Sequence, residues 1–276
     1  MKVKEISTKK IFEKNIKKLG KNLRKNLKRV SKKSTGENLH DYRVSYRRYM
    51  AGMKALEELF EVDLKLKDEN FQVRKIFKKS GELRDFILFK ERISIEEIDS
   101  LKAIETELKN KIKNIKSEVK EMIDKKSCIS LKKSISRREK IIKNLMSFKG
   151  KKEEEFNEKI NMMINKSFSE VISKRRDLKA EVDFEKIHKM RVAFKEFRYK
   201  MEFLRSYIDV PATVFNRMGK YQDLMGAILD AGNLSIYLEV FEEAKEFREE
   251  IERESEAFEE IFLTEIEVLF EFWKGK

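Results

Sequence analysis

Hydrophobic positions recur every three or four residues along almost the whole chain, and this spacing predicts helices. The predicted helices cover residues 5–30, 37–61, 69–91, 95–124, 153–179, 184–208, 212–239 and 241–273. Residues 125–134 and 149–151 are predicted to be connections around one shorter helix, and residues 34–37 a turn with an N-cap. The single proline, Pro211, stands at a predicted helix start, where its fixed φ fits. The pattern therefore predicts an all-α protein.

An internal repeat relates the two ends of this pattern. The chain has two histidines, and His40 and His188 both open the sequence H-x-x-R-V-x-aromatic-[R/K]. A second echo, G-x-x-x-D, follows each of them at residues 81–85 and 226–230. Two matches in the same order at nearly the same shift predict a duplicated helical module. We expect one half in residues 1–135 and the other in residues 136–276.

Both histidines head a row of cations on one side of a helix. At 100° per residue, His40, Arg43 and Arg47 share one face. In the second copy the row consists of His188, Arg191, Lys195 and Arg198. The opposite faces are apolar and predicted to be core: Leu39, Tyr42, Tyr46, Tyr49, Met53, Leu56 and Phe60 in the first copy, and Ile187, Phe194, Phe197, Met201 and Leu204 in the second.

Such rows of like charge are mildly unfavourable in an isolated helix, so something should offset them. An acidic helix could do this, and so could a bound polyanion, whose phosphate oxygens a guanidinium holds with two hydrogen bonds. Charge is also uneven along the chain: the net charge is +14, residues 1–60 carry +12, and residues 239–276 carry −9. This asymmetry favours a surface that meets an anion, although lysine-rich solvated helices would explain the charge alone.

These patterns resemble the CHAD family, the conserved-histidine α-helical domains. The second copy is the closer match, from His188 through Arg198, Tyr199 and Glu202 to the segment 221–230. The first copy resembles the family's H-x-x-R-V-x-x-R-R helix followed by G-x-x-R-D. One departure is Met50, where the family often has a further basic residue, so we expect the first half to bind an anion less tightly.

The resemblance implies two pseudo-symmetric helical bundles packed around a basic central groove or cavity that binds inorganic polyphosphate and can associate with polyphosphate granules. By position, the ligand-facing candidates are His40, Arg43, Arg47, Arg48, His188, Arg191, Lys195 and Arg198. Second-tier candidates are Lys75, Lys79, Arg84 and Lys220. Tyr199 and the two G-x-x-x-D elements are expected to serve packing, with Asp85 and Asp230 orienting nearby arginines.

An enzyme acting on phosphates is the first alternative. Phosphoryl transfer needs metal-binding carboxylates or a phosphate-cradling loop, and the chain has no G-x-x-x-x-G-K-[S/T] motif. Two histidines cannot build a zinc site without carboxylate or Cys128 help. We therefore expect no catalysis, no cofactor and no metal.

Two binding alternatives remain open. A sequence-independent nucleic-acid binder needs little more than phosphate contacts, and weak binding of this kind could accompany polyphosphate binding. No helix-turn-helix, zinc finger or RNA-stacking motif occurs, and the aromatic residues beside the rows occupy core positions. An adaptor that pairs its helices with a partner is the other alternative, although packing within the bundle explains their apolar stripes more simply.

The expected location is the cytoplasm. A single cysteine, Cys128, allows no internal disulfide, and no stretch reaches the roughly 20 apolar residues that span a bilayer. The first 20 residues lack the apolar core of a signal peptide. We expect no membrane partner.

Overall fold

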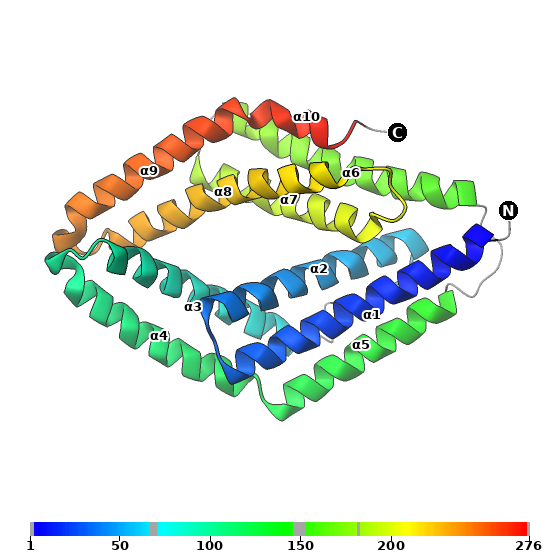
Figure 1. The fold of residues 1–276 in the computed structure, drawn as a ribbon, viewed down its shortest axis with the longest axis horizontal. Coiled ribbons are helices and arrows are strands. Elements are labelled where there is room, and N and C mark those ends of the chain that lie inside the picture. The colour runs from blue at the N-terminus through cyan, green and yellow to red at the C-terminus, as the bar shows by residue number, and fades with distance from the viewer. Residues whose placement is uncertain (1–2, 67–70, 146–152, 181–182, 275–276) are drawn as a thin grey trace. The chain divides into compact units, whose positions relative to one another are not determined.

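The structure, a computed structural model, describes residues 3–66, 71–145, 153–180 and 183–274. Within these ranges every regular element is helical, in ten α-helices and three short 3-10 helices (Figure 1). The all-α prediction is therefore confirmed. The chain divides into two compact units: Met1–Ile98 with Lys102–Phe156, and Asp99–Leu101 with Asn157–Lys276. The expected boundary at residues 135 and 136 falls inside a helix of the first unit.

The first unit is a bundle of five helices. They are α1 (Val3–Lys32), α2 (Gly36–Phe60), α3 (Phe71–Ile95), α4 (Lys102–Met122) and α5 (Lys125–Leu145). The predicted cap before α2 is present, since Thr35 Oγ1 accepts a hydrogen bond from the Asn38 amide at 3.3 Å. Of the predicted core residues of α2, all but the half-buried Phe60 are buried. The 3.6-residue apolar period thus fixes which side of α2 faces inward.

Helix α5 corrects one prediction, because residues 125–134 are not a connection. Asp124 caps the helix by accepting a hydrogen bond from the Ser127 amide at 2.6 Å, and Leu131 and Ile135 are buried from its first turns onward. The many lysines and serines of this segment suggest a loop by composition. The segment is helical because about one apolar residue per turn packs against the bundle, and this packing stabilises the helix. The predicted connection at 149–151 lies outside the described residues.

A buried arginine ties α5 to the segment that follows α2. Arg138 is 1% exposed, and its Nε donates to the Leu64 carbonyl at 3.1 Å while its Nη2 donates to the Lys65 carbonyl at 3.1 Å. A buried guanidinium is costly unless such acceptors surround it. These hydrogen bonds therefore hold the backbone after α2 against α5.

The second unit contains α6 (Glu153–Ala180, from Asn157 onward), α7 (Phe184–Leu204), α8 (Ala212–Leu238), α9 (Lys245–Thr264) and α10 (Leu269–Phe272). The 3-10 turns η1 (Asp99–Leu101), η2 (Glu242–Ala244) and η3 (Ile266–Val268) also belong to it. Helix α8 starts directly after Pro211, as predicted. All five predicted core residues of α7 are buried, and so is Tyr199.

The predicted helix at 241–273 is interrupted around Glu265, where α9 gives way to η3 and α10. The interruption directs Phe272 into an aromatic cluster, with its ring 5.8 Å from Phe194 and 5.8 Å from Tyr221. Tyr221 also lies 5.2 Å from Phe194 and 5.4 Å from Phe262. Aromatic packing therefore overrides helical continuity at the end of the chain. Helix α7 likewise ends at Leu204, four residues before its predicted end.

Candidate anion-binding site

The first group of predicted residues lies on α2. His40 is exposed, and Arg43 and Arg47 are half-buried. Arg43 Nη1 donates a hydrogen bond to the Phe77 carbonyl of α3 at 2.6 Å. The guanidinium groups of Arg43 and Arg47 lie 4.5 Å and 5.3 Å from the centroid of the Phe77 ring. One aromatic side chain of α3 therefore supports two cations of α2 by cation–π contacts.

A glycine of α3 makes room for Arg43. A Cβ atom at Gly81 would lie 2.5 Å from Arg43 Nη1 and 3.0 Å from its Cζ, which is too close for any other residue unless the arginine moves. The H-x-x-R and G-x-x-x-D elements are thus parts of one contact in this half. Gly81 gives space to the Arg43 side chain, and the expected use of the glycine for close helix approach stays a prediction.

Cations crowd together at this position. The pKa of Arg43 is lowered to about 10, mainly by burial and also by the positive charges of Arg47 and Arg84, whereas Asp85 opposes this shift. Arg43 remains charged at neutral pH. Arg84 therefore lies near enough to act on the row, and we name His40, Arg43, Arg47 and Arg84 the α2 cluster.

The other candidates of this half lie apart from the α2 cluster or have carboxylate partners. Arg48 is exposed about 140° around α2 from Arg43, given 100° per residue. Lys75 is exposed on α3. Lys79 Nζ lies 2.9 Å from Glu82 and 2.8 Å from Glu118, and these hydrogen-bonded carboxylates raise its pKa. Lys79 is accordingly a weaker candidate for an external anion.

The second group lies on α7, and we name His188, Arg191, Lys195 and Arg198 the α7 cluster. A Cβ atom at Gly226 of α8 would lie 2.9 Å from Arg191 Nη2. One at Gly219 would lie 3.5 Å from Arg198 Nη2, and one at Gly232 would overlap the Phe184 ring. Side chains seven residues apart on α7 therefore meet successive glycines of α8.

The charges of the α7 cluster also act on one another. Partial burial lowers the pKa of His188, and the positive charges of Arg191 and Lys195 lower it further. Arg198 has a local partner, since its Nε lies 3.1 Å from Glu202 Oε1. Lys220 is exposed on α8, next to Gly219. An anion bound at this cluster would reduce the repulsion among its positive charges. Anion binding and protonation of His188 should therefore favour each other.

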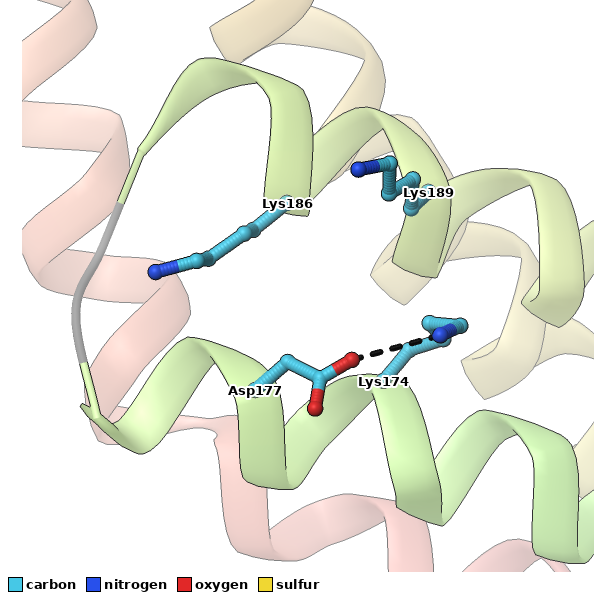
Figure 2. Close-up of a pocket in the computed structure, with 4 residues that line it drawn as sticks. All are labelled: Lys174, Asp177, Lys186 and Lys189. Atoms are coloured by element: carbon cyan, nitrogen blue, oxygen red, sulfur yellow. Dashed lines mark hydrogen bonds and ion pairs between the residues drawn. The ribbon is translucent and has the colours of Figure 1, made fainter.

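A separate pocket of about 400 Å³ lies between α6 and α7 and is lined by Lys174, Asp177, Lys186 and Lys189 (Figure 2). None of its lining residues was predicted. Its lysines have carboxylate partners: Lys174 lies 3.2 Å from Asp177, Lys186 lies 3.4 Å from Asp183, and Lys189 lies 2.7 Å from Glu185. The pocket is therefore locally balanced in charge, unlike the α7 cluster.

In the described part of the chain, no group of three or more histidine, cysteine or acidic side chains could hold a metal ion. None of the described helices is both long enough and apolar enough to cross a bilayer. What the two clusters can do chemically is hold several phosphate oxygens through guanidinium, ammonium and imidazole donors.

Comparison with known proteins places this geometry in a family. The CHAD domain family model matches residues 12–235, which is most of the chain. The chain belongs to the CHAD family. Among solved structures, the CHAD domain is similar to the crystal structure of the CHAD domain from the plant Ricinus communis. That similarity has a TM-score of 0.68 at 13% identity and covers 96% of this chain and 90% of the other, so it shows the shared fold. No curated protein matches the chain.

Sequence reasoning did not identify several residues that support the clusters. Phe77 and the glycines at 219 and 232 were not singled out, although the near-heptad spacing of glycines 219, 226 and 232 was visible in the sequence. That spacing matches residues 184, 191 and 198 of α7 in reverse order, as two antiparallel helices require. The roles of the candidate residues, the duplication and the central groove stay predictions.

Proposed function

We propose that this CHAD domain binds inorganic polyphosphate without catalysis, through the α2 cluster and the α7 cluster. The observation that carries the proposal is the crowding of cations at matching positions in both halves. Arg43 and Arg191 each stand three residues after a histidine, and each packs on the glycine of a G-x-x-x-D element. Membership in a family linked in general to polyphosphate binding supports the same ligand.

The physical reason is preorganisation. A guanidinium that packing already holds loses little side-chain entropy when it binds phosphate. The lowered pKa values of Arg43 and His188 indicate that burial and like charge disfavour their charged forms. A polyanion would offset this cost, and its binding should fall steeply with salt as counterions are exchanged.

The test is a binding titration at moderate salt that compares long-chain polyphosphate with single-stranded RNA at equal phosphate concentration. We expect polyphosphate to bind at least tenfold more tightly, which corresponds to about 1.4 kcal/mol. Equal affinity would mean that the clusters form a generic polyanion surface. A fluorescent fusion would test the accompanying proposal that the protein is cytoplasmic and gathers at polyphosphate granules.

A further inference from the structure

A second basic surface lies on α1, outside both clusters. Successive lysines of this helix fall within about 40° of one line along it, given 100° per residue. They are Lys14, Lys18, Lys21, Lys25, Lys28 and Lys32, and all are exposed. At 1.5 Å per residue the row is about 27 Å long. The opposite side of α1 packs into the bundle through Phe12, Ile16, Leu23 and Leu27.

Helix α5 lies beside α1 (Figure 1). A Cβ atom at Gly20 would lie 2.6 Å from the Ile135 side chain, so the glycine lets the two helices approach closely. Lys28 acts electrostatically on Cys128, which shows that α1 and α5 run antiparallel. The exposed lysines of one row of α5 are Lys125, Lys132 and Lys143. Together with the six lysines of α1 they form what we name the lysine face.

Few carboxylates accompany the lysine face. Among the residues whose side chains the structure describes, no ion pair joins any of its lysines to a carboxylate, and the acidic residues of α1 and α5 are the half-buried Glu13 and Glu139. Lysines elsewhere behave differently: Lys109 lies 3.0 Å from Glu105, and Lys111 lies 2.5 Å from Glu107. The lysine face therefore concentrates positive charge that the described acidic residues of α1 and α5 do not balance.

We propose that the lysine face binds the phosphate backbone of duplex nucleic acid independently of sequence, at a site separate from the two clusters. A duplex presents about 16 phosphates over 27 Å of its axis, so every lysine of the face has phosphates within reach. A lysine ammonium group is a point charge and lacks the planar donor geometry with which an arginine guanidinium recognises base edges. Lysines therefore suit contacts to the phosphate backbone. A 30-residue helix also suits a stiff polymer that need not bend to follow it.

The composition of this surface distinguishes duplex from other anions. Single-stranded nucleic acid is held largely by bases stacked on aromatic side chains. Helix α5 has no aromatic residue, and Phe12, the one aromatic residue of α1, is 1% exposed. Membrane-surface helices insert apolar or aromatic residues, whereas the only large apolar side chain exposed on the described parts of α1 and α5 is Ile129.

The experiment compares the full-length protein with a triple variant, Lys18→Gln, Lys21→Gln and Lys25→Gln, in titrations of a 30-base-pair mixed-sequence duplex over a range of salt. Lysine and glutamine have similar helix propensities, so α1 should stay folded. Each phosphate contact contributes about 0.9 to the slope of log affinity against log salt. We expect the slope to fall by about two to three and the affinity at 0.1 M salt to fall at least about 30-fold. Polyphosphate affinity should change less than about twofold, because the clusters are intact.

The matched control replaces three ion-paired lysines, Lys109→Gln, Lys111→Gln and Lys189→Gln, and removes the same charge elsewhere. It should keep both the duplex affinity and its salt slope. The proposal is overturned if the wild-type protein does not bind duplex, if the α1 variant keeps its slope, or if duplex and polyphosphate binding fall together in that variant. Lysine-face-dependent binding to vesicles with 30% anionic lipid, without duplex binding, would assign the surface to membranes instead. Loss of polyphosphate binding in cluster variants is measured separately, so failure of one proposal leaves the other testable.

Discussion

The α2 cluster and the α7 cluster begin with the same motif but are supported in different ways. In the first, Arg43 rests on one glycine, one aromatic ring and one backbone carbonyl of α3. In the second, α7 meets three glycines of α8, and Arg198 has a carboxylate partner on its own helix. Similar cation rows can therefore be held by specific side-chain contacts or by close helix packing. The two halves should respond differently to the same kind of substitution.

The largest expected effect comes from removing the arginine of each motif. Arg43→Ala with Arg191→Ala should weaken polyphosphate binding roughly 25-fold at 0.1 M salt, because each lost contact in a single-stranded polyanion removes about 0.7 from the logarithmic salt slope. The helical circular dichroism signal should persist. Of the single variants, Arg191→Ala should lose more affinity, since we expect the first half, with Met50, to bind less tightly. Full binding by the double variant would show that the site lies elsewhere.

Alanine substitutions at two glycines of α8 should change the free energy of unfolding in opposite directions. Gly232→Ala should lower the free energy of unfolding by about 1–3 kcal/mol, because the added methyl group would overlap the Phe184 ring. Gly219→Ala should raise it by about 0.5–1 kcal/mol, because its methyl group would make ordinary contact with Arg198 and alanine favours the helix. Urea denaturation followed by circular dichroism measures both. Equal effects at the two positions would contradict the close packing of α7 on α8.

The aromatic support of the α2 cluster predicts a smaller effect on binding. Phe77→Leu removes the ring beneath Arg43 and Arg47 and should weaken polyphosphate binding about two- to fivefold, which corresponds to the roughly 0.5–1 kcal/mol of one exposed cation–π contact. Phe168→Leu is the matched control, because Phe168 packs on Phe197, 5.1 Å away, in the other unit. Both variants should lose similar stability, and only the first should lose affinity. Equal affinity losses in the two variants would show that the Phe77 ring makes no specific contribution to polyphosphate binding.

The smallest expected effect is the pH dependence of the α7 cluster. The pKa of His188 is lowered, so folding stability should rise with pH around 6.5 and be lost as pH falls below that value. Bound polyphosphate favours the protonated imidazole, so affinity should increase from pH 8 to pH 6, and His188→Gln should reduce this increase. NMR titration of the two histidines should show the His188 pKa rising when polyphosphate binds. An unchanged His188 pKa would make this residue structural.

Sequence periodicity predicts much of this fold because burial of an apolar stripe depends on local spacing. Leu39, Met53, Phe194 and Met201 are all buried, as a 3.6-residue period requires. The interruption at Glu265 was not predictable in the same way, because it depends on Phe272 meeting Tyr221, a residue about 50 positions earlier. Local spacing carries no information about such distant contacts.

The candidate site also has features that local spacing predicts and features that it does not. The cation rows on α2 and α7 could be read from the sequence, since residues three and four apart share a helix face. The Glu118 partner of Lys79 and the ring beneath Arg43 could not, because they come from other helices. The contact between Arg191 and Gly226 lies between these cases: both motifs were visible, but not that one packs on the other.

The buried Arg138 has a consequence for synthesis of the chain. It hydrogen-bonds carbonyl groups of residues more than 70 positions earlier, so the backbone after α2 lacks these partners until α5 has left the ribosome. A nascent chain that ends at Ile123 should therefore leave the segment after α2 open to protease, whereas one that extends through Phe156 should protect it. The first unit is thus expected to complete its folding only after α5 has been synthesised, although α1 and α2 leave the ribosome much earlier.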